Sequence, residues 1–331
     1  MDILAPYLMF LGDVHDQLAA KTATGVVHWR KDDCIGQVRF EDCHADLRLP
    51  DMTIAEGAQA GARTLVIGAV NPGGVLPDHW IDAIVEALEA GMDVASGLHQ
   101  RLTSSSRIVE TAERLDRKLF DVRHADGTFP TGKGTKRSGK RLLTVGTDCS
   151  VGKMYTSLAI HAEMQKRAMA ADFRATGQTG ILIVGSGVSI DAVISDFISG
   201  ATETLSPTAD PDHWDVVEGQ GSLFHPSFAG VTIGLIHGSQ PDALVMCHEP
   251  TRTKMRNVEH PIPDLQACID LHVRAATLTN PDARCIGVAV NTSALDEAAA
   301  RKCLEDIEKQ TGLPTVDPVR TGVVRLVDAL S

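Results

Sequence analysis

The sequence contains no long apolar segment. No apolar run approaches the roughly 18–20 residues that a membrane-spanning helix needs, so we expect no membrane as a partner. The first four residues, Met-Asp-Ile-Leu, lack the basic flank and the cleavage site of a signal peptide. These two absences favour a cytoplasmic location.

Basic residues are also in short supply. The 31 Lys and Arg residues face 43 Asp and Glu residues, which leaves a net charge of −12. An acidic surface of this size repels nucleic acid and anionic lipid, so we expect neither as a partner. Any anionic ligand must then be held by a local cluster of positive charge.

Metal-binding cysteine patterns are missing as well. The seven cysteines are scattered, odd in number and never spaced as C-x-x-C, which argues against a disulfide framework and against a zinc site. We therefore expect reduced thiols and no bound metal. The length of 331 residues and the apolar content of 43% suit two ordinary globular domains.

The N-terminal part alternates short apolar runs with helical patterns. Thr64–Val70 is rich in β-branched residues and predicts a buried parallel strand, followed by a turn at Asn71–Gly74. Asp78–Ala90 has helical spacing, Met92–Ser96 predicts the next strand, and a helix follows over about Ser105–Leu119. This order predicts a Rossmann-like sheet. No G-x-G-x-x-G follows a strand, so we assign no dinucleotide.

A stretch rich in glycine, proline and basic residues follows, over residues 124–141. We predict a Rossmann-like N-terminal domain over residues 1–125, a linker over 126–141, and a P-loop domain over 142–331. The five Lys and Arg residues of the stretch could attract a phosphate, but a solvated linker is the favoured interpretation.

The second domain alternates strand and helix patterns throughout. Strands are predicted at residues 142–145, 180–184, 215–217, 231–235, 243–246 and 285–290. Helices are predicted at residues 152–170, 190–198, 262–275 and 296–310. The alternation predicts an α/β fold with a doubly wound, mostly parallel sheet.

A glycine-bounded loop joins the first of these strands to the first helix. It consists of Gly146, Thr147, Asp148, Cys149, Ser150, Val151, Gly152, Lys153 and Met154. Glycines let backbone N–H groups turn toward an anion, the helix N-terminus adds partial positive charge, and Lys153 adds a full one. The order of strand, glycines, lysine and helix predicts a phosphate-binding P-loop.

This loop departs from the usual pattern in two ways. Five residues separate its glycines instead of four, and Met154 stands where a Ser or Thr usually follows the lysine. In nucleotide hydrolases that hydroxyl binds magnesium, for which a thioether is a poor ligand. The loop is therefore poorly suited to Mg-ATP, although it could hold a phosphate that does not react.

An acidic residue marks the end of another predicted strand. Glu218 follows Asp215–Val217 and precedes a glycine-rich turn that brings backbone close to the carboxyl edge of the sheet. In a nucleotide enzyme this carboxylate would bind magnesium. It is equally suited to be a general base, and a solvated turn carboxylate is the third interpretation.

These motifs resemble known proteins. The loop Gly146–Lys153, with Val217-Glu-Gly-Gln-Gly221 downstream, is similar to dethiobiotin synthetase and its P-loop relatives. With His225-Pro226 and the stretches at residues 237–243 and 247–250, the pattern resembles a family long catalogued as a domain of unknown function. That family includes D-glutamate N-acetyltransferases of the DgcN type, and the resemblance covers nearly the whole chain.

The resemblance implies transfer of acetyl from acetyl-CoA to the amine of D-glutamate or a similar acidic amino acid. The P-loop would grip the CoA phosphates without cleaving them, which accounts for Met154. Glu218 is the first candidate for the base and His225 the second, ahead of His237 and His248. Asn291 follows a strand at the position that contacts the nucleotide base in dethiobiotin synthetase-like proteins, so it would touch adenine.

The remaining candidates concern the acyl acceptor. Gln220 and Ser222 are predicted to bind substrate, and Arg252 and Arg256 to bind its carboxylates, with a solvated basic loop as the alternative. Two other functions stay open. One is an ATP-dependent ligase or kinase like dethiobiotin synthetase, and the other is a non-catalytic nucleotide or CoA sensor. A homo-oligomer is expected because enzymes of this build often assemble.

Overall fold

The computed structural model describes residues 3–17, 19–69, 75–125 and 127–330, and the turn predicted at Asn71–Gly74 lies outside them. The chain forms two compact units. The N-terminal unit comprises the chain up to residue 125 together with Gly177–Ala192. The P-loop unit comprises Gly127–Thr176 and the chain from Val193 onward.

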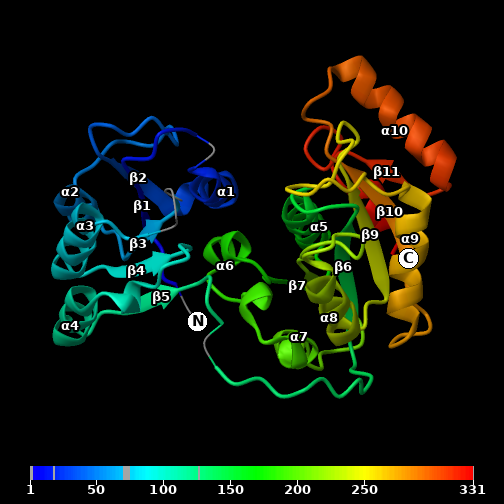
Figure 1. The fold of residues 1–331 in the computed structure, drawn as a ribbon, viewed down its shortest axis with the longest axis horizontal. Helices are drawn as coiled ribbons and strands as arrows, with labels where there is room; N and C mark the ends of the chain where they lie inside the picture. The colour runs from blue at the N-terminus through cyan, green and yellow to red at the C-terminus, as the bar shows by residue number, and fades with distance from the viewer. Residues whose placement is uncertain (1–2, 18, 70–74, 126, 331) are drawn as a thin grey trace. The chain divides into compact units, whose positions relative to one another are not determined.

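The N-terminal unit is built on a five-stranded parallel sheet of order β2-β1-β3-β4-β5. Its strands are β1 (Tyr7–Gly12), β2 (Cys34–Arg39), β3 (Thr64–Ile67), β4 (Asp93–Ser96) and β5 (Leu119–Asp121). Its helices are α1 (Lys21–Trp29), α2 (Ile54–Gln59), α3 (Asp78–Glu89), α4 (Ser106–Leu115) and α6 (Gln178–Val184), with short 3-10 turns at Lys31–Asp33, Leu102–Ser104 and Ile190–Ala192. Helices α2, α3 and α4 lie on one side of the sheet and α1 and α6 on the other (Figure 1).

This arrangement confirms the predicted Rossmann-like pattern. The three central strands β1, β3 and β4 are buried along their whole length, as expected for a parallel sheet with helices on both faces. The helix predicted over Ser105–Leu119 is shorter than expected. It ends at Leu115 because Asp116 adopts a left-handed conformation (φ 52°), and the last predicted residue begins β5 instead.

The P-loop unit contains a six-stranded parallel sheet of order β11-β10-β9-β6-β8-β7. Its strands are β6 (Lys140–Gly146), β7 (Ala171–Arg174), β8 (Trp214–Val217), β9 (Ala243–His248), β10 (Arg284–Val290) and β11 (Thr315–Val316). Its helices are α5 (Lys153–Lys166), α7 (Ile198–Leu205), α8 (Ala229–Ser239), α9 (Leu265–Thr277), α10 (Glu297–Thr311) and α11 (Val324–Asp328), with a 3-10 turn at Ser195–Phe197. A core of α5, α11 and sheet side chains supports the strand that carries the P-loop.

Two predicted strands are wrong. Residues 180–184 lie in helix α6 and residues 231–235 in helix α8. Both are short apolar runs, and periodicity alone does not separate a buried strand from a buried helix. The helix predicted at residues 190–198 is replaced by two 3-10 turns ahead of α7.

The basic stretch before β6 is packed against the P-loop unit. Arg141 is fully buried within β6 and donates to Ser206 Oγ, and Arg137 donates to the carbonyls of Ser206 and Gly238. Burial lowers the pKa of Arg137 to about 10. The prediction of a solvated stretch is therefore wrong for these two residues, because their guanidinium groups satisfy buried backbone carbonyls.

Among the residues that the structure describes, no helix combines the length and the apolar character needed to cross a bilayer.

Candidate active site

The P-loop lies at the carboxyl edge of the sheet, between the end of β6 and the start of α5. A side chain on Gly146 would lie 2.8 Å from Val151 Cγ2, so the loop closes tightly on itself. Ser150 and Gly152 have positive φ angles of 54° and 103°. Such left-handed positions turn successive amides toward one side of the backbone, which is the geometry of an anion-binding nest.

Lys153 is buried beneath this loop. Its Nζ donates to the Asp148 carbonyl at 2.8 Å. Burial lowers the pKa of Lys153, and the charges of Asp148 and Glu218 oppose that shift. The ammonium of Lys153 therefore lies where its positive charge would attract an anion held by the loop amides.

Asp148 fixes the shape of the loop. Its side chain is fully buried, and its carboxylate accepts from the backbone N–H of Cys149 at 2.6 Å and of Arg256 at 2.8 Å. Arg252 Nη1 donates to the same carboxylate at 2.9 Å. Arg252 also donates to the carbonyls of Cys149 and Ser150. This carboxylate thus joins the P-loop to the segment after β9.

The two arginines predicted to bind carboxylates have different surroundings. Arg252 is committed to the P-loop and to an ion pair with Glu249 at 3.1 Å. Arg256 is exposed, and among the described residues its guanidinium bonds to Ser150 Oγ. Arg256 is the better placed of the two to meet a ligand at the rim of the loop.

The hydroxyl groups of Thr156 and Ser157 in α5 bond to backbone carbonyls at the start of that helix. Thr156 Oγ1 donates to the Gly152 carbonyl at 3.0 Å. Ser157 Oγ bonds to the carbonyls of Lys153 and Met154. Neither hydroxyl replaces the magnesium ligand that is missing at Met154.

Glu218 directly follows β8 and is held firmly in place. Its side chain is 4% exposed, and Oε2 accepts from the Thr176 backbone N–H at 2.9 Å. Thr176 Oγ1 donates to the Glu218 carbonyl at 2.6 Å. A Cβ on Gly219 would lie 1.7 Å from the Thr144 carbonyl, so only glycine lets the chain pass here.

The other residues of the glycine-rich turn have mainly structural contacts. Gln220 Nε2 donates to Thr176 Oγ1 at 3.1 Å, which places it beside Glu218. Ser222 is fully buried and its Oγ accepts from a backbone amide. His225 accepts from the Ser227 amide on Nδ1 and contacts the Arg256 carbonyl through Nε2 at 3.0 Å, a pattern assigned to the neutral ring. Both its nitrogens are engaged, which makes it a weaker candidate base than Glu218.

Of the remaining predicted residues, Asn291 lies near the second P-loop glycine, His248 lies at the end of β9, and His237 lies elsewhere. Asn291 follows β10, and its Cβ lies 4.0 Å from where a Cβ on Gly152 would be. His248 Nδ1 lies 3.0 Å from Thr147 Oγ1, and burial lowers the pKa of this histidine. His237 lies within helix α8, so its predicted place after a strand is wrong.

One group of potential metal ligands adjoins the loop. Ligand atoms of Asp148, Cys149 and His225 lie within 4.8 Å of one another. The carboxylate and the imidazole are already engaged by protein donors and acceptors, and burial raises the pKa of the Cys149 thiol. These contacts disfavour metal binding at this group.

The sequence did not point to Thr176, to Thr144 or to the hydrogen bond from Arg252 to Asp148. Thr176 lies two residues after the short strand β7, which no pattern predicted. The general rule that polar residues just after parallel strands gather at one edge would have pointed to it, had β7 been recognised.

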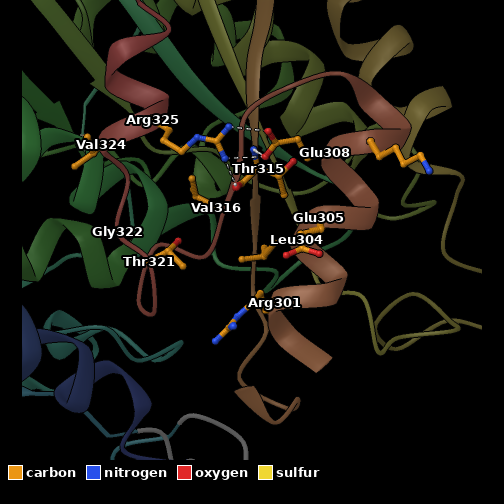
Figure 2. A pocket seen from close by; sticks show the side chains of 11 residues that line it. Arg301, Leu304, Glu305, Glu308, Thr315, Val316, Thr321, Gly322, Val324 and Arg325 are labelled. Atoms are coloured by element: carbon orange, nitrogen blue, oxygen red, sulfur yellow. Dashed lines mark hydrogen bonds and ion pairs between the residues drawn. The ribbon is translucent and has the colours of Figure 1, made fainter. Parts of the chain in front are cut away.

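A surface pocket of about 610 Å³ lies between α10, β11 and α11. Figure 2 shows Arg325 facing Glu308, which also accepts from the Thr315 amide. None of the predicted site residues lines this pocket.

Comparison with known proteins identifies the family of this chain. The model of a P-loop domain described as a domain of unknown function, DUF1611, matches residues 128–327. The model of the family's Rossmann-like N-terminal domain matches residues 38–125. The chain belongs to the DUF1611 family.

Relatives of this DUF1611 chain are similar to it over their full length. It is 52% identical over 330 residues to a protein of Tritonibacter scottomollicae named D-glutamate N-acetyltransferase, covering 99% of each chain. It is 50% identical over 328 residues to a protein of Pseudoalteromonas with the same name, again covering 99% of each. A crystal structure of a DUF1611 family protein from Anabaena variabilis superposes with a TM-score of 0.87, at 31% identity and 98% coverage of both chains. An N-acetyltransferase needs an acyl donor as well as an acceptor amine.

Proposed function

We propose that this protein transfers the acetyl group of acetyl-CoA to the amine of D-glutamate or a similar acidic amino acid. The observation that carries the proposal is a P-loop with a buried lysine whose neighbouring hydroxyls are turned into the helix. Such a loop suits a diphosphate that is held and not cleaved. The full-length similarity to two proteins named D-glutamate N-acetyltransferase supports the chemistry.

In this proposal the residues Gly146–Met154 hold the CoA diphosphate. The amides of the loop and the ammonium of Lys153 balance its negative charge. Asn291, beside Gly152, would contact the adenine. An ATP-dependent ligase would need a magnesium ligand at the loop, and the contacts of Thr156 and Ser157 argue against one.

Glu218 is the proposed general base. The base takes a proton from the acceptor ammonium, and the freed amine attacks the thioester carbonyl. The C–S bond then breaks, and CoA leaves as its thiol with the proton that the nitrogen loses. Glu218 directly follows β8, and its orientation is fixed by Thr176. The flexible pantetheine arm links the diphosphate to the thioester. This arm must therefore fold back over the loop for the thioester to reach an amine that Glu218 has deprotonated.

The acceptor carboxylates need cations and hydrogen-bond donors. Arg256 is exposed at the rim of the loop and provides a guanidinium fork that suits a carboxylate. Gln220 shares Thr176 with Glu218 and is proposed to orient the acceptor beside the base. Arg252 contributes indirectly, by holding the loop in shape through Asp148.

Glu218→Gln tests the proposal. With acetyl-CoA and D-glutamate, we expect kcat to fall by roughly 10²–10⁴-fold, because a positioned base contributes about that much. Binding of acetyl-CoA, followed by calorimetry, should be retained. Glu297→Gln, at an exposed carboxylate of α10, is the matched control and should keep full activity.

Three results would count against the proposal. Absence of acetylated product with the unmodified protein would rule out the reaction. Full turnover by Glu218→Gln would reject Glu218 as the base, and binding without turnover in every assay would favour a sensor.

A further inference from the structure

Thr176 contacts Glu218 at two points. Its backbone N–H donates to the carboxylate at 2.9 Å, and its Oγ1 donates to the Glu218 carbonyl at 2.6 Å. Thr176 is fully buried, and its Oγ1 also accepts from Gln220. One threonine therefore holds both the proposed base and the residue proposed to orient the acceptor.

The chain leaves the P-loop unit directly after this threonine. Thr176 is the last residue of the first of that unit's two segments. The next sixteen residues, Gly177–Ala192, belong to the N-terminal unit before the chain returns at Val193. The segment carrying Glu218's partner is thus continuous with a piece of the other unit.

The crossing segment Gly177–Ala192 is anchored within the N-terminal unit by specific contacts. Gln178 Oε1 accepts from Arg123 Nη1 at 2.9 Å, only one residue beyond Gly177. The Ile183 carbonyl accepts from Arg30 Nη1 at 2.7 Å, and the Gly185 carbonyl accepts from the backbone N–H of Ile3 at 3.2 Å. The anchoring therefore begins two residues after Thr176.

We propose that Thr176 is a positioning residue for Glu218, and that the N-terminal unit supports this position through the crossing segment. This inference rests on the proposed function. The N-terminal unit then contributes to turnover without placing a reacting group, since it restrains the backbone that orients the base. A misplacement of the base by about 1 Å is enough to lower a rate substantially.

The test compares variants at Thr176 and at the anchor. Thr176→Val keeps the shape and the backbone N–H but removes the hydroxyl that bonds to Glu218, and Thr176→Ser restores that hydroxyl. We expect Thr176→Val to lower kcat by about tenfold with both KM values within about twofold, and Thr176→Ser to recover most of the kcat. Gln178→Ala, which releases Arg123, should lower kcat by about threefold to tenfold.

Gln17→Ala is the matched control in the N-terminal unit, where Gln17 bonds to Thr24 and to the Asp46 amide, neither of which belongs to the crossing segment. It should leave kcat unchanged. Unchanged turnover in Thr176→Val, equal impairment of Thr176→Ser, or equal rates for Gln178→Ala and Gln17→Ala would each overturn the inference. If Thr176→Val does not fold, the comparison of Gln178→Ala with Gln17→Ala decides.

Failure of this inference is distinguishable from failure of the proposed function. If Glu218→Gln is inactive while Thr176→Val and Gln178→Ala turn over normally, only the positioning role is wrong. If Glu218→Gln turns over normally, the assignment of the base is wrong and the positioning role falls with it.

Discussion

At the scale of single residues, the buried carboxylate of Asp148 is the contact on which the loop depends most. It accepts three hydrogen bonds, one of them from Arg252. Asp148→Asn removes the negative charge and turns one acceptor oxygen into an NH₂ group, which cannot accept from the three donors around it. We therefore expect the free energy of unfolding to fall by about 1–3 kcal/mol. Urea denaturation measures this change. Asp212→Asn, at a 98% exposed carboxylate, is the control, and an equal effect of both variants would refute the role of Asp148.

The sequence predicted which residues gather here but not what they do for one another. The P-loop, Glu218, Arg256 and Asn291 follow strands, and a parallel sheet brings such positions to one edge. Arg252 was predicted to bind substrate, since a basic residue after a strand carries no sign of its partner. That partner, Asp148, lies more than a hundred residues earlier in the chain, so folding alone brings them together.

At the scale of elements, the close approach of β6 to the turn after β8 makes Gly219 indispensable. A methyl group at this position would overlap the Thr144 carbonyl. We expect Gly219→Ala to destabilise the protein by more than about 4 kcal/mol, or to prevent folding. Gly230→Ala in α8 meets nothing within 4 Å and should change stability by less than about 1 kcal/mol. Similar thermal unfolding of the two variants would contradict this account.

Several elements with a clear apolar pattern were predicted, whereas β7 was not. Helices α3 and α10 and the strands β3, β4, β9 and β10 follow their apolar patterns. Strand β7 has only four residues, two of them charged, and it is defined by pairing with β8. Helix α8 is apolar on most sides because it packs against α7 and α9, so its sequence resembles a buried strand.

At the scale of the whole molecule, stability depends on pH through buried histidines. Burial lowers the pKa of His272 from an ordinary value of 6.5 to about 4. The unfolded chain therefore takes up a proton between these values while the folded chain does not, so stability is complete above pH 6.5 and falls as the pH drops toward 4. The loss from this residue should reach about 2 kcal/mol at pH 5.

His272→Leu tests this prediction. The free energy of unfolding, measured in urea at pH 7 and pH 5, should change less with pH in the variant than in the unmodified protein. His15→Gln, at an exposed histidine, should keep the original dependence. A His272→Leu protein with an unchanged pH dependence would show that this histidine does not carry the effect.

The assignment of whole domains was easier than the path of the chain between them. The basic stretch before β6 predicted a break in the chain, yet two of its arginines pack inside the P-loop unit. No sequence signal indicated that Gly177–Ala192 returns to the N-terminal unit. Its glycines and apolar run are equally compatible with a strand of the second sheet, and only tertiary contacts distinguish the two.

The central claim is that the loop from Gly146 to Met154 holds the CoA diphosphate through its amides and Lys153. Calorimetric titration of acetyl-CoA into the unmodified protein and into Lys153→Ala tests it most directly, with Lys302→Ala, at an exposed lysine, as the control. We expect Lys153→Ala to weaken binding by roughly 10–100-fold and Lys302→Ala to leave it unchanged. Equal affinity of all three proteins for acetyl-CoA would contradict the account.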